Sequence, residues 1–136
     1  MIEIPSTILD AIESYLIKQY PLEGCGLISA DISFDKLDTV VGWFPCKNKA
    51  KSAKLYELDP VDYLKADRAA EDKLQQIIGV VHSHTHSDPY PSPTDVNNAP
   101  DPSWHYVIVS LRFPSPSTRS YKILDGKINE EKIVIT

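Results

Sequence analysis

Apolar residues recur with helical spacing in two long stretches of the chain. In residues 5–20 they fall on one stripe, and Pro21 ends the segment. The stripe consists of Ile8, Ile12, Tyr15 and Leu16. A second helix is predicted to begin at Asp59-Pro60, because Asp is favoured at an N-cap and Pro at the next position, and to run to about Gln75. Its apolar face consists of Tyr63, Ala66, Ala70 and Leu74.

Shorter apolar runs bounded by turn residues predict strands. The segments 23–30 and 37–46 flank a turn at residues 31–35. The run 77–84 is typical of a buried strand that ends in polar residues, and the run 104–111 is the clearest strand in the chain.

The end of the chain predicts a hairpin. Asp125-Gly126 is a strong turn signal between strands at 119–124 and 127–135. The expected order is therefore α-β-β-α-β-α-β-β-β, including a short helix described below. Interleaved helices and strands with a terminal hairpin predict an α/β (α+β mixed) fold, in which helices pack on one mixed sheet.

Size, charge and cysteine content narrow the class of protein. The 136 residues fit a single domain covering residues 1–136. The net charge of −5 makes nucleic acid and anionic membranes unexpected partners. No apolar run approaches the ~20 residues that span a bilayer, and the N-terminal segment lacks the basic region of a secretory signal. Cys25 and Cys46 are too few for a disulfide framework, so we expect a cytoplasmic protein.

Three of the four histidines lie within five residues, at the end of the predicted strand 77–84. Side chains two apart in a strand share a face, so His82 and His84 can converge on one metal ion while Ser83 points the other way. Two unrelated histidines would explain this i, i+2 spacing poorly. His86 follows the strand and is expected to be an exposed loop residue, whereas an apolar strand around His105 predicts a buried, hydrogen-bonded histidine.

A third ligand is available eleven residues beyond His84. The intervening stretch 87–93 must be irregular, because its three prolines fix φ and remove hydrogen-bond donors. A short helix is predicted from Pro93 to Asn98, with Ser92 at its N-cap and Asp95 at its third position. Asp95 could merely cap this helix. Beside a His-x-His strand end, however, two histidines and one carboxylate form the donor set of a catalytic zinc site.

A hydrolytic metal site also needs a general base that is not a ligand. Glu23 stands apart among the preceding acids, because it opens a predicted strand and is followed by glycines that permit close backbone approach. From spacing alone, an exposed glutamate at the strand entry is favoured. Cys25 lies on the same face as Glu23 in a regular strand, and it is expected to be a small buried hydrophobe rather than a nucleophile.

Together these residues resemble the signature of the JAMM (MPN+) metallopeptidases, E…H-S-H-x7-S-x-x-D. Glu23, the run 82–84, Ser92 and Asp95 match it, and every spacing after the first histidine fits. The short form and the E-x-C-G-L run at 23–27 look like the bacterial and archaeal branch of the family.

The resemblance implies a curved mixed sheet flanked by helices, similar to the cytidine-deaminase-like architecture. It implies one zinc ion per chain bound by His82, His84 and Asp95, with Glu23 as general acid/base and Ser92 stabilising the oxyanion. The implied activity is hydrolysis of the amide or isopeptide bond after the C-terminal Gly-Gly tail of a ubiquitin-like sulfur-carrier protein, in some members with release of cysteine.

Two segments leave alternatives open. Many family members have Pro after the second histidine, whereas this chain has Thr85-His86, which implies either a more mobile loop or a second metal contact through His86. The Lys-rich stretch 46–54 has no periodicity and is expected to be a solvated loop, with contact to an acidic carrier protein as the alternative.

Three other functions are compatible with parts of the pattern. Histidine-triad nucleotide hydrolases also carry H-x-H-x-H, but with hydrophobic residues where this chain has Ser83 and Thr85. Non-haem iron oxygenases use two histidines and a carboxylate, usually with the acid two residues from the first histidine. A metal-free MPN-type scaffold would be expected to lose the ligands that this chain keeps.

Overall fold

A six-stranded mixed sheet forms the centre of the computed structural model, which describes residues 1–33 and 36–136. The strand order is β3-β2-β4-β5-β6-β7, in which β4 and β5 are parallel and all other neighbours are antiparallel. The elements are β1 (Ile2–Ile4), α1 (Ser6–Gln19), β2 (Cys25–Asp31), β3 (Val40–Cys46), α2 (Pro60–Asp72), β4 (Gln75–His84), α3 (Pro93–Asn97), β5 (His105–Ser110), β6 (Ser117–Leu124), β7 (Lys127–Glu131) and β8 (Ile133–Ile135). The predicted mixed α/β architecture is confirmed.

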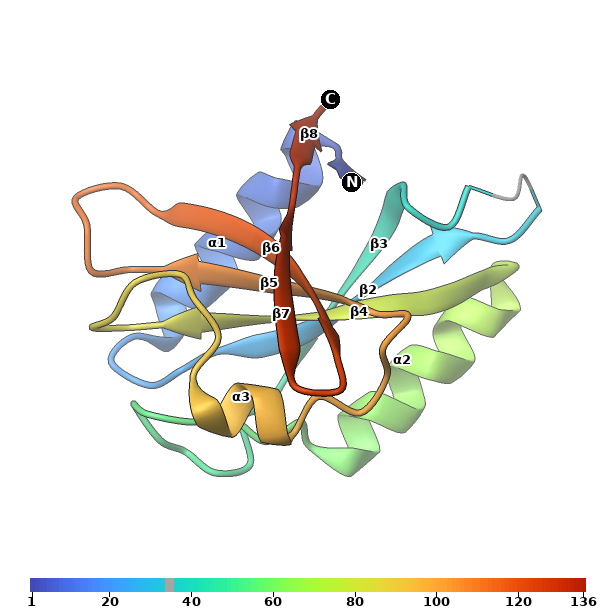
Figure 1. Cartoon of the computed structure of the whole chain (residues 1–136). Helices are drawn as coiled ribbons and strands as arrows, with labels where there is room; N and C mark the ends of the chain where they lie inside the picture. The colour runs from blue at the N-terminus through green and yellow to red at the C-terminus, as the bar shows by residue number, and fades with distance from the viewer. Residues whose placement is uncertain (34–35) are drawn as a thin grey trace.

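Helices cover both faces of the sheet, because successive strand residues alternate between two apolar clusters. Ile28 belongs to the cluster beneath α1, whose buried side chains are Leu9, Ile12 and Leu16. Leu27 belongs to the opposite cluster, which includes Ala66 of α2 and contacts α3. Figure 1 shows α1 behind the strands and α3 in front of them. In the part of the chain that is described, no helix has the length and apolar character needed to cross a membrane.

Helix α2 begins where the sequence predicts and ends earlier. The Asp59 side chain accepts a hydrogen bond from the Asp62 N–H at 3.1 Å, as expected for an N-cap followed by Pro. The helix ends at Asp72 instead of about Gln75, because Leu74 adopts a left-handed conformation (φ 56°) that turns the chain into β4. Leu74 is consequently exposed, and its assignment to the apolar face of the helix was wrong.

The chain ends differ from the prediction. The expected strand 127–135 is divided at Lys132, and its second part, β8, pairs in parallel with β1. The strand β1 has three residues, which are too few for an alternating pattern to be recognised in the sequence. The ends of the chain therefore lie close together (Figure 1). The hairpin turn is confirmed, with positive φ at Asp125 and Gly126. Of the predicted turn at 31–35, residues 34 and 35 lie outside the described residues.

The two strands before α2 are shorter than predicted. The first begins at Cys25, so Glu23 precedes it instead of opening it, and the second begins at Val40 instead of residue 37. Glu23 is therefore carried by the connection between α1 and β2.

His105 is buried and hydrogen-bonded, as predicted. Its Nδ1 lies 2.6 Å from the Glu131 carboxylate and its Nε2 lies 3.0 Å from Asp38. Ser120 donates a further hydrogen bond to Glu131 at 2.8 Å. Burial alone would raise the pKa of Glu131, but the hydrogen bonds from His105 and Ser120 outweigh it and bring this pKa to about 2. One carboxylate thus joins β5, β6 and β7.

Replacing Glu131 with Gln should lower the free energy of unfolding by about 2–3 kcal/mol at pH 7, because a buried charged acceptor is lost. The pKa of Glu131 is lower in the folded protein than the ordinary value of 4.5, so its contribution is present above that value and is lost as the pH falls towards about 2. Urea unfolding at a series of pH values measures the difference between the two proteins.

The control is Glu130→Gln, which removes an exposed ion pair with Arg119 and should cost less than about 1 kcal/mol. Equal losses for the two substitutions would contradict the role assigned to Glu131.

Candidate metal centre

Three side chains converge where the parallel strands β4 and β5 end. His82 and His84 close β4, and Asp95 lies in the first turn of α3. The Nε2 atoms of the two histidines are 3.1 Å apart, and the Asp95 Oδ2 atom lies 3.2 Å from His82 Nε2 and 3.0 Å from His84 Nε2. Ligand atoms placed tetrahedrally at ~2.0–2.1 Å from zinc would lie about 3.3 Å apart. The spacing of the three donor atoms is therefore close to that of a metal-ligand set.

Contacts behind the donors hold them in position. The Nδ1 atom of His84 lies 2.8 Å from the Asp88 carbonyl oxygen, so Nδ1 carries a proton and, in the neutral imidazole, the Nε2 lone pair is available to a metal. The Asp95 Oδ2 atom accepts the Ser92 N–H at 2.9 Å, and Ser92 Oγ accepts the Asp95 N–H at 3.0 Å. Asp95 thus caps the helix and also faces both histidines. Its predicted capping role and its position as a candidate metal ligand are therefore compatible.

Burial and hydrogen bonding act on the charge of each donor. Burial lowers the pKa of His82, which favours the neutral imidazole that binds metals. Burial also opposes ionisation of Asp95, but hydrogen bonds from both histidines outweigh it and lower the pKa of that carboxyl. For His84, the effect of burial is exceeded by hydrogen bonds to Asp95 and the Asp88 carbonyl, which raise its pKa. A metal ion would therefore compete with a proton chiefly at His84.

Glu23 is buried beside this cluster, which corrects the expectation of an exposed glutamate. The residue is 4% exposed, and its Oε1 atom is buried with no hydrogen-bond partner in the described part of the chain. Burial raises the pKa of Glu23 to about 8, an effect only partly offset by the neighbouring His84. An orphaned carboxyl oxygen beside three converging donors fits a site that binds a divalent cation and its water.

One cleft joins the candidate base, ligand and oxyanion residues. Its volume is about 440 Å³, and Glu23, His84 and Ser92 line it together with Ala53, Lys54, Thr85, His86 and Ser87. Because Ser92 Oγ already accepts the Asp95 N–H, its own hydroxyl proton is free to donate into this cleft. The arrangement can therefore bind a metal, move a proton and stabilise a developing negative charge.

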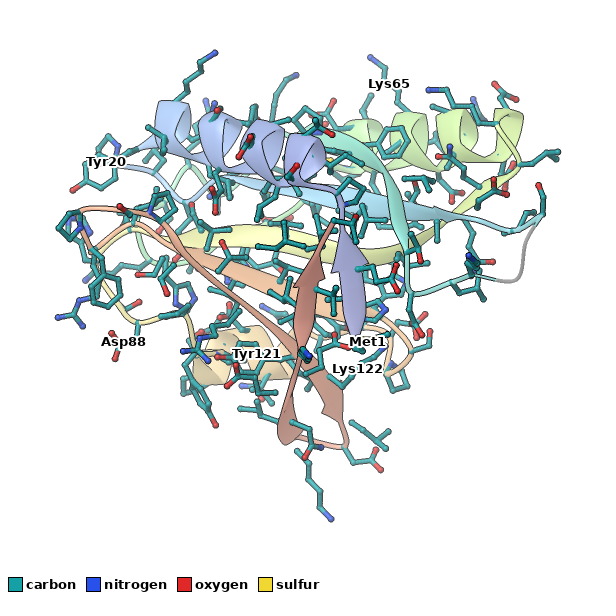
Figure 2. The ribbon with its side chains drawn as sticks, turned by 90° about the horizontal axis from the view of Figure 1, so that it is seen from above. Met1, Tyr20, Lys65, Asp88, Tyr121 and Lys122 are labelled. Atoms are coloured by element: carbon teal, nitrogen blue, oxygen red, sulfur yellow. The ribbon has the colours of Figure 1, made fainter. Side chains whose placement is uncertain are left out.

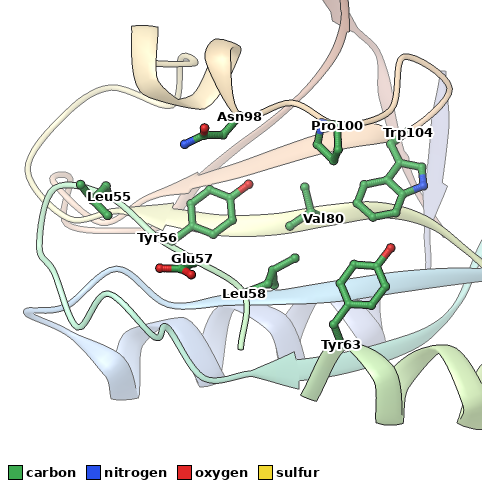
Figure 3. Close-up of a pocket in the computed structure, with 9 residues that line it drawn as sticks. All are labelled: Leu55, Tyr56, Glu57, Leu58, Tyr63, Val80, Asn98, Pro100 and Trp104. Atoms are coloured by element: carbon green, nitrogen blue, oxygen red, sulfur yellow. The ribbon is translucent and has the colours of Figure 1, made fainter. Parts of the chain in front are cut away.

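Tyr56 is a neighbour of the centre that the sequence did not indicate. Its ring stacks on His82 with the ring centroids 4.3 Å apart. Tyr56 also borders a pocket of about 430 Å³, where Tyr63, Trp104 and Val80 lie (Figure 3). No local spacing marks Tyr56, because its position depends on how the loop before α2 folds back onto β4.

Thr85 and His86 are engaged in contacts instead of completing the donor cluster. Buried Thr85 donates a hydrogen bond from Oγ1 to the Ala53 carbonyl at 3.2 Å. His86 is exposed, as predicted, and its Nε2 lies 3.2 Å from the Tyr20 hydroxyl. Figure 2 shows Tyr20 and Asp88 at the same end of the molecule. Among the described residues the donor cluster contains His82, His84 and Asp95 without His86.

The amino-acid sequence of this chain is similar to those of known proteins. The family Prok-JAB, described as prokaryotic homologs of the JAB domain, matches residues 5–124, and the chain belongs to this family. A protein named CysO-cysteine peptidase from Mycobacterium tuberculosis is 35% identical over 131 residues, which cover 96% of this chain and 88% of the relative. A protein named desampylase from Pyrococcus furiosus is 31% identical over 97% of this chain and 89% of its own length.

The fold is shared with a protein of Desulfitobacterium hafniense whose structure was solved in solution. The two chains are 28% identical, the TM-score is 0.87, and the match covers 100% of this chain and 93% of the other. Membership of the JAB family sets aside the histidine-triad and oxygenase alternatives.

Cys25 is a small buried hydrophobe, as predicted. It lies opposite Cys46 in the β2–β3 pairing, and both thiols are free and buried. Burial raises the pKa of each thiol to about 12. Neither residue has the exposure or the thiolate character of a nucleophile.

We expect both cysteines to resist alkylation by iodoacetamide at pH 8 in the folded protein and to react completely in denaturant. Intact mass spectrometry counts the modified thiols. Rapid labelling of Cys25 in the folded protein would contradict the assignment and revive a thiol-dependent mechanism.

Proposed function

We propose that this protein is a zinc-dependent peptidase that hydrolyses the amide or isopeptide bond after the C-terminal Gly-Gly tail of a ubiquitin-like sulfur-carrier protein, releasing cysteine where cysteine is the adduct. The observation that carries this proposal is the single cleft shared by Glu23, the ligand His84 and Ser92. The names of the relatives, CysO-cysteine peptidase and desampylase, support the class of bond and substrate.

His82, His84 and Asp95 would hold the zinc ion, since two imidazoles and a carboxylate leave a fourth position open. When bound, zinc lowers the pKa of a coordinated water towards ~7 and polarises the substrate carbonyl. The cation would also draw the pKa of buried Glu23 down from about 8, because a nearby positive charge favours the carboxylate. The carboxylate is the form of Glu23 that accepts a proton, so this shift favours its action as a general base.

The chain's own residues divide the remaining work. The unpartnered Glu23 Oε1 takes a proton from the attacking water and passes it to the leaving amine. The Ser92 hydroxyl donates a hydrogen bond to the carbonyl oxygen as negative charge develops there. Losing one such donor typically lowers the rate by about 10²–10³-fold.

A stiff segment beside the cleft favours a narrow, extended substrate segment. Ser87 and Ser92 line the cleft, and the chain between and just after them contains Pro89, Pro91 and Pro93, whose fixed φ angles stiffen this wall. Glycine residues can approach such a wall and the zinc closely, because they carry no side chain. A flexible Gly-Gly tail meets this requirement.

Purified protein should contain about one zinc ion per chain after dialysis, and His84→Ala and Asp95→Ala should each remove it, because each deletes one of three protein ligands. His86→Ala is the matched control and should keep full occupancy, since His86 lies outside the donor cluster. Elemental analysis measures the metal. Full zinc content in both ligand variants would refute the ligand assignment.

Glu23→Gln should keep the zinc and the thermal stability of the wild type, while hydrolysis falls by about 10²–10⁴-fold because the proton acceptor is gone. The substrate is a ubiquitin-like sulfur carrier with cysteine joined by its amine to the terminal glycine, and intact mass follows the cleavage. Wild-type protein treated with a chelator should also lose activity. Undiminished turnover by Glu23→Gln would exclude Glu23 as the base.

A further inference from the structure

The Lys-rich segment before α2 is a tied loop, organised by the side chain of Asn48. The Asn48 Nδ2 atom donates hydrogen bonds to the Glu23 and Leu55 carbonyl oxygens, both at 3.0 Å. Its Oδ1 atom accepts the N–H groups of Ala50 and Glu57, also at 3.0 Å. The amide thus uses both of its donors and both lone pairs of its oxygen. One side chain connects three parts of the loop with the backbone of Glu23.

Backbone pairing closes the loop around this amide. The Lys49 N–H donates to the Glu57 carbonyl at 2.8 Å, and the Asp59 N–H donates to the Lys47 carbonyl at 3.1 Å. The four lysines of the stretch are exposed, whereas Asn48 is half-buried. These lysines are Lys47, Lys49, Lys51 and Lys54. The solvated loop expected from the sequence therefore has an ordered polar interior.

The loop contacts the candidate base Glu23 and also the end of β4, which carries the candidate ligand His84. Its Ser52 carbonyl accepts the Glu23 N–H at 2.8 Å, so both backbone polar groups of Glu23 are bonded to the loop. Its Ala53 carbonyl accepts the Thr85 hydroxyl, one residue beyond His84. The Glu23 Oε1 atom has no hydrogen-bond partner in the described residues, whereas the backbone of Glu23 is anchored to the loop by these two hydrogen bonds.

We infer that Asn48 is a positioning residue for the general base Glu23, acting through the backbone of Glu23 and the loop that Asn48 ties together. This inference rests on the proposed hydrolytic function. A base acts only within a narrow range of distances from the proton it takes, and a misplacement of about 1 Å can cost on the order of 10²-fold in rate. Asn48 itself belongs neither to the donor cluster nor to the residues that line the cleft.

The test is Asn48→Ala in zinc-loaded protein, assayed with the carrier–cysteine adduct. We expect kcat to fall by about 10²-fold with KM changed less than about 3-fold and zinc retained, because the base matters in the transition state and not in substrate binding. Asn129→Ala is the matched control, an exposed asparagine on β7, and should leave both constants unchanged. In the Glu23→Gln background, Asn48→Ala should reduce the rate by less than about 3-fold, because there is no base left to position.

A second readout does not depend on activity. In metal-free protein, Asn48→Ala should speed hydrogen exchange at the amides of Glu23, Ala50 and Glu57 by at least about 10-fold, while amides within α1 stay protected. Asn48→Asp keeps an acceptor for Ala50 and Glu57 but sets an oxygen against the Glu23 and Leu55 carbonyls. Asn48→Asp should therefore speed hydrogen exchange at the Glu23 amide and lower kcat. These two measurements on Asn48→Asp test the inference if Asn48→Ala fails to fold.

Two results would overturn the inference. One is an unchanged kcat, or a raised KM with unchanged kcat, in both Asn48 variants. The other is an equal cost of Asn48→Ala with and without Glu23, which would mean that Asn48 does not act through the base. Absence of chelator-sensitive hydrolysis in the wild type would instead refute the proposed function, and the exchange at Glu23 would still show whether Asn48 holds it.

Discussion

The pairing of β2 with β4 decides where Glu23 lies relative to the donor cluster of His82, His84 and Asp95. Cys25 is opposite His82, and beyond this pair the Ser83 N–H donates to the Gly24 carbonyl at 3.0 Å while the Gly24 N–H donates to Ser83 Oγ at 2.8 Å. A slip of one residue would turn the alternating side chains of β4 to the opposite face and separate the histidines from the cleft. Glu23 therefore reaches the ligand cluster through a register fixed by the antiparallel strands and the Gly24–Ser83 contact.

Much of the site was predictable because its signals are local. The i, i+2 spacing of His82 and His84 on a strand, and the capping pattern of Ser92 and Asp95, depend on a few neighbouring residues. Both appear in the structure as the sequence indicates. The strands β4 and β5 and the terminal hairpin are similarly recognisable from apolar runs and a two-residue turn.

The features that were missed depend on contacts between distant parts of the chain. Spacing alone favoured an exposed Glu23, and its burial follows from the β2–β4 pairing and from the loop that covers it. The pairing of β1 with β8 joins the two ends of the chain, which no local pattern can report. Tyr56 and Asn48 lie in a segment without periodicity, and their roles arise only when that segment folds against β4 and Glu23.

The candidate metal centre brings together buried polar groups whose burial the rest of the fold must stabilise. A carboxyl with an orphaned oxygen is buried at Glu23, and three donor atoms lie within 3.0–3.2 Å of one another. The orphaned oxygen of Glu23 costs free energy in a folded protein without a cation, because it is removed from water and has no hydrogen-bond partner in the described residues. The two apolar clusters on either face of the sheet, together with the Glu131 network at its far strands, supply the stability that keeps the arrangement in place. A divalent cation bound by the three closely spaced donor atoms would contribute favourable coordination. Metal binding and folding stability should therefore be linked in this protein.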